Sequence, residues 1–404
     1  MELNRKLIIT KLNQRILTTL LENNEVAEIH CTCEETQENR ALLGNIYVGR
    51  VKNIVANINA AFIEIAKGVE CYYAIGENPT PIFTKKIGKK PLCIGDELLV
   101  QVSREAVKTK VPTVTSKLEF SGKYAVLTYG DVRIGASSKL SKEEKERLTQ
   151  IAKKYASRQY GLILRTNANE ISEDILNAEI ERLIQEYTRL VQNASTRIVF
   201  SCLKSAPKMY LTELKNIYQD GLTDIVVEDE ELFEEIRNFL EQYQAEDLNK
   251  LRLYKDKTLP LHKLYSIEKR IEDALKERVW LKSGAYLVIQ PTEALTVIDV
   301  NTGKCIDKKR DDRAYFKINM EAAKETARQI RLRNLSGIII IDFINLSEKE
   351  LTDELLQYFE RELKKDPIAT TLVDITKLQL VEVTRKKIRK PFHEAYSDAL
   401  PQNS

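Results

Sequence analysis

Two apolar segments that each end in an aspartate constrain this chain more than any other feature of its sequence. Residues 295–301 read LTVIDVN, and residues 338–343 read IIIIDF. Each predicts a buried β-strand, and the apolar residues at 316, 320, 323, 327 and 330 predict one face of a helix between them. A strand, a helix and a strand in this order favour a parallel pair. Asp299 and Asp342 would then emerge side by side at the carboxyl edge of the sheet.

Two carboxylates at this edge predict a metal site. Asp299 and Asn301 share a face because residues two apart in a strand point the same way. Carboxylates this close repel each other unless a cation lies between them. Mg²⁺ is typically held by one or two carboxylates together with water and substrate phosphate, and Mn²⁺ is the expected substitute. An Asp after a strand is more often a turn or helix cap, so either Asp alone would be explained that way.

Composition limits the other functions that the chain can have. It has 404 residues, a net charge of +3, 43 % apolar residues and 30 % charged residues, as in ordinary globular proteins of two to four domains. No apolar run approaches the roughly 18 residues of a membrane span, and the N-terminus does not resemble a signal peptide. The six cysteines are expected to be reduced thiols of a cytoplasmic protein. Three scattered histidines argue against a histidine pair, so hydrolysis would depend on carboxylates and a metal.

The remaining segments predict a mixture of sheets and helices. Short strands at 44–51, 60–65 and 98–102, with a turn at 57–59, predict a small OB-type barrel. Strands are expected at 124–128 and 161–164, with a helix at 141–155 that Ser141 caps. Further predictions are helices at 175–191 and 266–282, a strand at 224–227 and a hairpin of 285–290 with 295–300. Gly337 is expected to end the helix before the second Asp segment.

Several motifs resemble the ribonuclease E/G family. QPTEALTVIDVN at 290–301, the helix at 321–333 and IDFI at 341–344 are similar to the metal-site region of that family. Residues 44–62 resemble its S1 domain, and GLILRT at 161–166 resembles its 5′-end sensor. The resemblance covers nearly the whole chain, and the last third is the most specific part.

The resemblance implies an α/β fold with several subdomains. An RNase H-like subdomain would be split between residues 1–39 and 207–275. An S1 barrel at 40–119 and a 5′ sensor at 120–206 would be inserted between the halves. A DNase I-like subdomain at 276–390 would carry the metal, and 391–404 would form a polar tail.

The resemblance also implies an activity, which is Mg²⁺-dependent endonucleolytic cleavage of single-stranded RNA in RNA processing and decay. Substrates with a 5′ monophosphate would be preferred. Asp299 and Asp342 would bind the metal, and Asn301 would orient the phosphate or the ligands. Two alternatives stay open, namely a non-catalytic RNA-binding protein that keeps the S1 and sensor surfaces, and a metal-dependent nuclease that acts on DNA.

Four residues match the positions that contact RNA in the S1 region of the family. Phe62 and Tyr72 would stack bases, and Arg104 and Lys110 would contact phosphates. Core packing is the alternative for Phe62, and a solvated basic loop is the alternative for the two cations. The family often has an arginine where Val107 stands, and its phosphate contact would be absent here or supplied by Lys108.

Four other residues match the 5′-phosphate pocket. Arg165 and Thr166 would hold the terminal phosphate through a guanidinium and a hydroxyl group. Gly122 and Val126 match backbone positions of the same pocket. Without the resemblance, a surface ion pair would be the simpler explanation for Arg165.

One departure from the family concerns zinc. Many relatives have a Cys-x-x-Cys after the catalytic region that shares zinc between two subunits, whereas no cysteine follows Cys305 here. Zinc is therefore not expected, and any homodimer would form without a zinc link. The chain is expected to be closer to the G type than to the longer E type.

Overall fold

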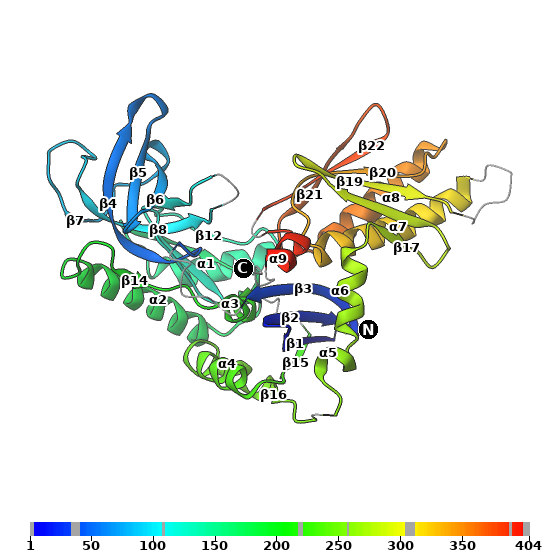
Figure 1. Cartoon of the computed structure of the whole chain (residues 1–404), viewed down its shortest axis with the longest axis horizontal. Coiled ribbons are helices and arrows are strands. Elements are labelled where there is room, and N and C mark those ends of the chain that lie inside the picture. The colour runs from blue at the N-terminus through cyan, green and yellow to red at the C-terminus, as the bar shows by residue number, and fades with distance from the viewer. Residues whose placement is uncertain are drawn as a thin grey trace. The chain divides into compact units, whose positions relative to one another are not determined.

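The computed structural model describes residues 4–33, 41–106, 110–216, 221–256, 258–303, 312–387 and 390–398. The chain forms two compact units. Residues 1–34 and 219–404 form one unit, and residues 35–218 form the other. Both units combine helices and sheets (Figure 1). None of the described helices is long and apolar enough to cross a membrane.

The unit of residues 35–218 contains a closed β-barrel. The strands of its sheet are β4 (Ile46–Val55), β5 (Ala60–Ala66), β6 (Val69–Ala74), β7 (Phe83–Lys85), β8 (Glu97–Arg104), β9 (Thr113–Thr115) and β14 (Cys202–Lys204). The order β4-β5-β6-β9-β8 closes because β8 also pairs with β4. A Cβ on Gly49 of β4 would lie only 2.5 Å from the Cγ2 atom of Ile63, so the barrel requires glycine there. The predicted OB-type barrel is therefore present.

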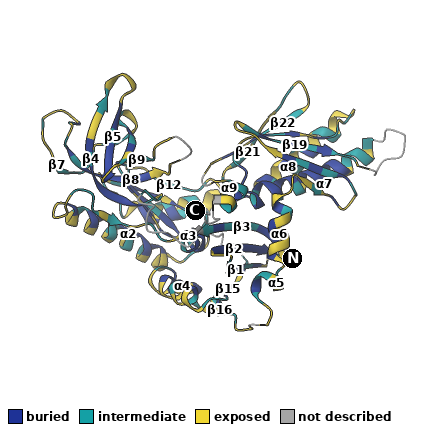
Figure 2. Cartoon of the chain, viewed as in Figure 1, coloured by how far each residue is buried: buried dark blue, intermediate teal, exposed yellow. Residues whose placement is uncertain are grey.

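A second sheet in this unit is covered by two helices. Its strands, in spatial order, are β10 (Glu119–Ser121), β11 (Ala125–Tyr129), β13 (Tyr160–Leu164) and β12 (Ile134–Ala136). The two helices on it are α1 (Lys142–Lys153) and α2 (Glu173–Ala194), and α3 (Met209–Asn216) follows later in the same unit. Ser141 caps α1 as predicted, because its hydroxyl accepts a hydrogen bond from the Glu144 amide. The apolar stripe of α2, which includes Leu176, Ile180 and Leu183, is buried against the sheet (Figure 2).

The other unit begins with a sheet that joins segments distant in sequence. Its strands, in spatial order, are β16 (Leu251–Leu253), β15 (Leu222–Val227), β1 (Arg5–Leu12), β2 (Arg15–Glu22) and β3 (Glu25–Cys33). β1 pairs with β15 in parallel, so the N-terminal hairpins and the region after residue 219 form one sheet. The adjoining helices are α4 (Glu230–Tyr243), α5 (Leu261–Leu264) and α6 (Ile267–Leu275).

A six-stranded sheet completes this unit. Its strands, in spatial order, are β17 (Arg278–Trp280), β18 (Tyr286–Pro291), β19 (Leu295–Asn301), β20 (Gly337–Asp342), β22 (Leu380–Arg385) and β21 (Thr370–Ile375). The helices that pack on it are α7 (Asp312–Leu332) and α8 (Lys349–Leu363), whereas α9 (Phe392–Asp398) packs on β3 of the five-stranded sheet. Ile298 and Ile341 belong to the strand face that packs in one core with Ala323 of α7 and Phe359 of α8. α7 and α8 therefore cover one face of this sheet. The alternate side chains of each strand point to the other face, which these two helices do not cover.

The sequence predicted the wrong end for two helices. The helix expected at 266–282 stops at Leu275, because residues 278–280 pair with 286–288 as β17. Gly337 does not end α7. Asn334 does so in the left-handed conformation (φ 48°), with the Leu335 amide bonded to the Ile330 carbonyl, and Gly337 (φ 84°) begins β20.

Part of the segment predicted as a polar tail is helical. Phe392 at the start of α9 is 2 % exposed and joins the core with Ile29 of β3. Cys71, Cys93 and Cys202 are free thiols, Cys31 and Cys71 are buried, and Cys202 is exposed. Cys305 lies outside the described residues.

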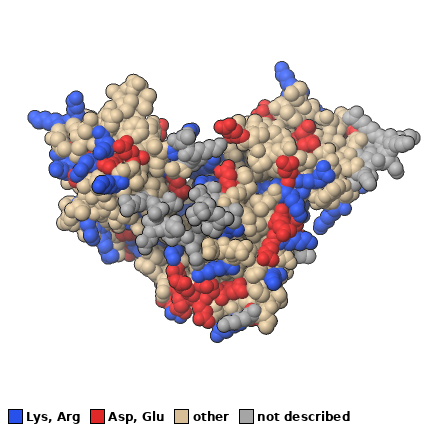
Figure 3. Space-filling model, viewed as in Figure 1, with Lys and Arg blue, Asp and Glu red and all other residues tan. Residues whose placement is uncertain are grey.

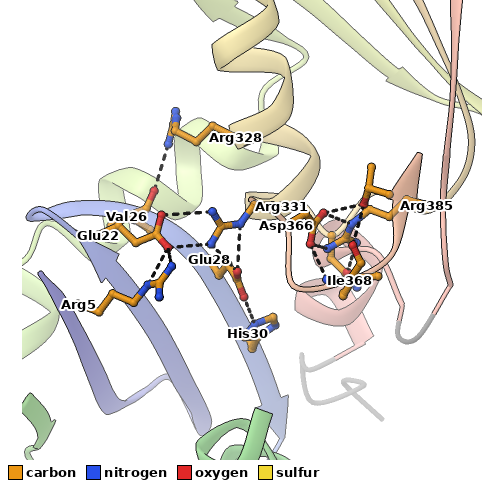
Figure 4. A network of polar contacts seen from close by, with 12 residues as sticks. Arg5, Glu22, Val26, Glu28, His30, Arg328, Arg331, Asp366, Ile368 and Arg385 are labelled. Atoms are coloured by element: carbon orange, nitrogen blue, oxygen red, sulfur yellow. Dashed lines mark hydrogen bonds and ion pairs between the residues drawn. The ribbon is translucent and has the colours of Figure 1, made fainter. Parts of the chain in front are cut away.

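A half-buried polar network fixes α7 to the five-stranded sheet (Figure 4). The guanidinium of Arg331 contacts Glu28 at 2.8 Å and Glu22 at 3.2 Å, and Arg5 also bonds to Glu22 at 2.9 Å. Burial alone would raise the pKa of Glu28, but the hydrogen bond with His30 and the charge of Arg331 hold it below its ordinary value. Burial also raises the pKa of Glu22, but the charges and hydrogen bonds of Arg331 and Arg5 outweigh it. The pKa of Glu22 is therefore lowered as well.

We predict that Arg331→Met costs about 1.5–3 kcal/mol of unfolding free energy at pH 7, because it removes the charged hydrogen-bond partner that the half-buried Glu22 and Glu28 share. Since both carboxylates have lowered pKa values when folded, their contribution is present above about pH 4.5 and is lost as the pH falls. The difference in unfolding free energy between wild type and Arg331→Met should therefore become smaller on acidification. Urea unfolding followed by Trp280 fluorescence at pH 7 and pH 4 measures it.

The control is Lys364→Met, which removes an exposed ion pair with Glu360 and should cost less than about 1 kcal/mol. An Arg331 variant as stable as this control at pH 7 would contradict the account.

Candidate functional site

The parallel pairing of β19 with β20 brings the two aspartates together. Asp299 and Asp342 are register partners, as the sequence predicted, so their Cα atoms are about 5 Å apart, the spacing of neighbouring strands. α7 connects the two strands and packs beneath them. The two carboxylates come from neighbouring strands and lie on the same face of the sheet.

Neither aspartate is a helix cap. β19 continues through Asp299 to Asn301, and α8 begins at Lys349, well beyond Asp342. The amide Nδ2 of Asn301 donates a hydrogen bond of 2.6 Å to the Oδ2 of Asp299. This contact fixes the orientation of one carboxylate of the pair.

The electrostatics of the pair suit a divalent cation. Burial and the neighbouring carboxylate of Asp299 both raise the pKa of Asp342, so the two charges oppose each other. Within the described residues, no group of three or more His, Cys, Asp or Glu side chains is placed to hold a metal. Two carboxylates and an amide nevertheless fit Mg²⁺, which is normally bound by one or two carboxylates and keeps several waters.

Asn319 holds the backbone next to Asp342. This α7 residue is fully buried, donates to the Ile344 carbonyl at 2.7 Å and accepts from the Ile344 amide at 3.0 Å. The position of the segment after β20 is therefore set by the helix beneath it. Asn319 was missed from the sequence, although a polar residue on the apolar face of a predicted helix is a visible signal.

The barrel places two aromatic residues on its outer face. Phe62 on β5 pairs with Tyr72 on β6, and their half-buried rings meet edge to face with centroids 6.4 Å apart. Their sequence neighbours Ile63 and Cys71 are fully buried, so Phe62 is not part of the barrel core.

The strand pairing that joins Phe62 and Tyr72 extends across two further strands to Arg104. Tyr72 pairs with Thr113 on β9, and Thr113 pairs with the exposed Arg104 on β8. Lys110 is exposed in the segment that leads into β9. Val107 and Lys108 lie outside the described residues.

Three of the four predicted 5′-sensor residues meet at one end of the four-stranded sheet. The guanidinium of Arg165 is half-buried and donates to the Gly122 carbonyl at 2.8 Å. Thr166 follows directly, and its hydroxyl bonds to that of Ser137 at 2.8 Å. Val126 lies in β11 directly after Ala125, whose carbonyl accepts from the Gly122 amide at 2.8 Å, and it pairs with Ser121 of β10 and with Ile163 of β13.

A buried carboxylate organises this end of the sheet. Glu179 of α2 is 6 % exposed and accepts hydrogen bonds from the amides of Lys123, Tyr124 and Ala125 at 2.7–2.9 Å. A Cβ on Gly122 would lie 2.3 Å from the Glu179 carboxylate, so glycine is required there. Glu179 was also missed, although it interrupts the apolar stripe of a predicted helix.

Side chains of both charges surround Arg165. The Lys215 carbonyl lies 3.5 Å from the Arg165 guanidinium, and the Lys215 ammonium donates to the Ser121 carbonyl at 3.3 Å. Burial, helped by the charges of Lys204 and Arg182, lowers the pKa of Lys215 to about 8. The Glu179 carboxylate acts on both Arg165 and Lys215, so the local charge is mixed and Arg165 is the cation that the Gly122 carbonyl holds in place.

Charge is unevenly spread despite the small net value. Figure 3 shows Lys and Arg side chains around β7 of the barrel and Asp and Glu side chains over α4. The acidic residues of α4 include Glu230, Glu231, Glu234 and Glu241. The barrel side is therefore the better match for a polyanion.

Comparisons with known proteins agree with this geometry. The family model described as "Ribonuclease E/G family" matches residues 119–388. Ribonuclease G of Haemophilus influenzae is 31 % identical over 393 residues, which cover 95 % of this chain and 79 % of that protein. Ribonuclease G of Escherichia coli is 30 % identical over 94 % of this chain and 79 % of its own length. Ribonuclease E of a Synechocystis species is 31 % identical over 89 % of this chain and 54 % of its own length.

We predict that a divalent ion stabilises this chain through the aspartate pair. Mn²⁺ at 100 times its dissociation constant should stabilise the EDTA-treated wild type by about 2.7 kcal/mol. Asp342→Asn should lose most of this gain, because one of the two carboxylates is removed. Chemical unfolding with and without Mn²⁺ measures the effect.

Asp353→Asn, which changes an exposed carboxylate of α8, is the matched control and should keep the full gain. Equal stabilisation of Asp342→Asn and the control would mean that the ion binds elsewhere.

Proposed function

The chain belongs to the ribonuclease E/G family and is an endoribonuclease, and we propose that it uses Mg²⁺ to cleave single-stranded RNA in RNA processing and decay. The observation that carries the proposal is the side-by-side placement of Asp299 and Asp342, with Asn301 bonded to Asp299. This site lies within the residues that the family model matches.

Each residue of the pair would have a defined role. Asp299 and Asp342 would hold the metal, and Asn301 would keep Asp299 in position. Mg²⁺ held there would supply Lewis-acid polarisation of a phosphate oxygen and activation of water. No histidine is required for this chemistry, and none of the three histidines of the chain lies near the pair in sequence.

We further propose that the barrel binds the RNA strand. Phe62 and Tyr72 would stack bases at about 1–3 kcal/mol per base without sequence preference. Arg104 and Lys110 would contact phosphates. The pairing of Phe62, Tyr72 and Arg104 across neighbouring strands of the barrel, through Thr113, supports this assignment.

The 5′ end of the RNA would bind beside the four-stranded sheet. Arg165 and Thr166 would receive a terminal monophosphate, and Gly122 and Val126 would contribute backbone positions to the same pocket. The half-buried guanidinium of Arg165, followed in the chain by the Thr166 hydroxyl, supports a preference for this charged end.

The proposal extends to the subdomains. The five-stranded sheet would be the RNase H-like part, formed by residues 1–39 and 207–275. Residues 40–119 and 120–206 would be the S1 barrel and the 5′ sensor. The six-stranded sheet within 276–390 would be the DNase I-like part. The joint sheet of β1 and β15 supports the split of the first of these.

The test is a cleavage assay on one RNA sequence with a 5′ monophosphate, a 5′ hydroxyl or a 5′ triphosphate, with and without Mg²⁺. We expect cleavage only with the ion, and fastest for the monophosphate. Asp299→Asn and Asp342→Asn should abolish cleavage but keep RNA affinity within about threefold, because the proposed binding surfaces are elsewhere.

Two outcomes would favour the other candidate functions. RNA binding without any cleaved product at all would indicate a non-catalytic RNA-binding protein. Faster cleavage of a matched DNA strand than of the RNA would indicate a DNA nuclease. The Asp353→Asn variant serves as the active control.

A further inference from the structure

A second group of residues shares the open face of the six-stranded sheet with the aspartate pair. Trp280 on β17 pairs with Tyr286 on β18, and Tyr286 pairs with Asn301 on β19. In the next row, Arg278 pairs with Val288, and Val288 pairs with Asp299. Because register partners point to the same face, all these side chains lie on the face opposite α7 and α8.

One aromatic residue of this group is unusually accessible, whereas Tyr286 is half-buried. Trp280 is the only tryptophan of the chain and is 63 % exposed. A tryptophan buries more apolar surface than most side chains when it packs, so leaving it in solvent gives up stabilisation. An exposed aromatic residue next to a candidate catalytic site points to a ligand with a flat apolar surface.

The group also has the geometry of a stacking surface. The rings of Trp280 and Tyr286 are 5.1 Å apart between centroids at an interplanar angle of 57°. The guanidinium of Arg278 lies 4.4 Å from the Tyr286 ring centroid and 5.8 Å from that of Trp280. Two aromatic faces beside a fixed cation suit a nucleobase and its phosphate.

We propose that Trp280, Tyr286 and Arg278 bind one nucleotide of the RNA strand next to the scissile phosphate, with its base stacked on Trp280. This inference rests on the proposed function. Trp280 lies two strands from Asn301, or about 10 Å at the usual strand spacing. The base is therefore held on the same sheet as the metal site and positions the adjacent phosphodiester there.

The chemistry favours a nucleotide over a protein partner. Arg278 supplies a positive charge that matches a phosphate, and a base stacks on an indole whatever its sequence. The group is also continuous with the row that contains Asn301, the residue proposed to orient the metal ligands. The side chains therefore form one surface that runs from the metal site to β17 at the sheet edge.

Intrinsic fluorescence tests the inference because Trp280 is the single tryptophan. Asp342→Asn protein, which is expected not to cleave, is titrated with a 5′-monophosphorylated oligoribonucleotide. Saturable quenching of Trp280 is expected. Replacing one nucleotide beside the scissile position by an abasic residue should remove the quenching, whereas abasic residues farther away should not.

Cleavage kinetics give a second readout. Trp280→Ala in the active protein should raise KM about 5- to 100-fold, as the loss of one stacked base implies, with a smaller change in kcat. Trp280→Phe should restore most of the affinity because it keeps an aromatic face. Leu378→Ala, which removes a 78 % exposed apolar side chain in the β21–β22 turn at the opposite edge, is the control and should match wild type.

The outcomes separate this inference from the proposed function. Active wild type with no quenching and with an unchanged KM for Trp280→Ala would overturn only the stacking surface. Wild type that cleaves no RNA would overturn the proposed function, and the inference would fall with it. Circular dichroism of Trp280→Ala checks that a raised KM does not come from misfolding.

Discussion

The parallel pairing of β19 with β20 is the constraint on which the rest of the site depends. It places Asp299 beside Asp342, where two negative charges oppose each other and raise the pKa of Asp342. The protein tolerates this arrangement because the opposite face of both strands is packed against α7 and α8. Hydrophobic burial on the face that α7 and α8 cover thus offsets the repulsion between the two carboxylates on the other face. A bound cation would remove this repulsion.

Helix α7 connects this site to the remainder of its unit. It links the two aspartate strands, its Asn319 fixes the backbone after Asp342, and its Arg331 is anchored between Glu22 and Glu28 of the N-terminal sheet. Moving α7 away from the sheet would break the contacts of Arg331 with Glu22 and Glu28, so the network favours one position of the helix. The position of the metal-bearing strands is therefore set from below by contacts distant in sequence.

The sequence predicted the aspartate pair because an apolar strand, an amphipathic helix and a second strand have few arrangements. It did not predict β17, since the charged segment at 266–282 has helical periodicity and the pairing of Trp280 with Tyr286 depends on a turn at Gly284 (φ 87°). The exposed Trp280 was missed for the same reason. Glu179 and Asn319 were visible as polar residues on apolar helix faces, but their backbone partners come from other elements and cannot be found from local pattern. The aromatic pair and Arg165 were assigned through family resemblance, and the structure adds their register and contacts.

The most direct test of the central claim is a crystal structure of the chain soaked in Mn²⁺, with anomalous diffraction data collected at the manganese edge. The account predicts an anomalous peak between the carboxylates of Asp299 and Asp342, at about 2.0–2.2 Å from their oxygens, as for the small hard cations that carboxylates bind. A peak at another site, with no manganese between these two side chains, would contradict it.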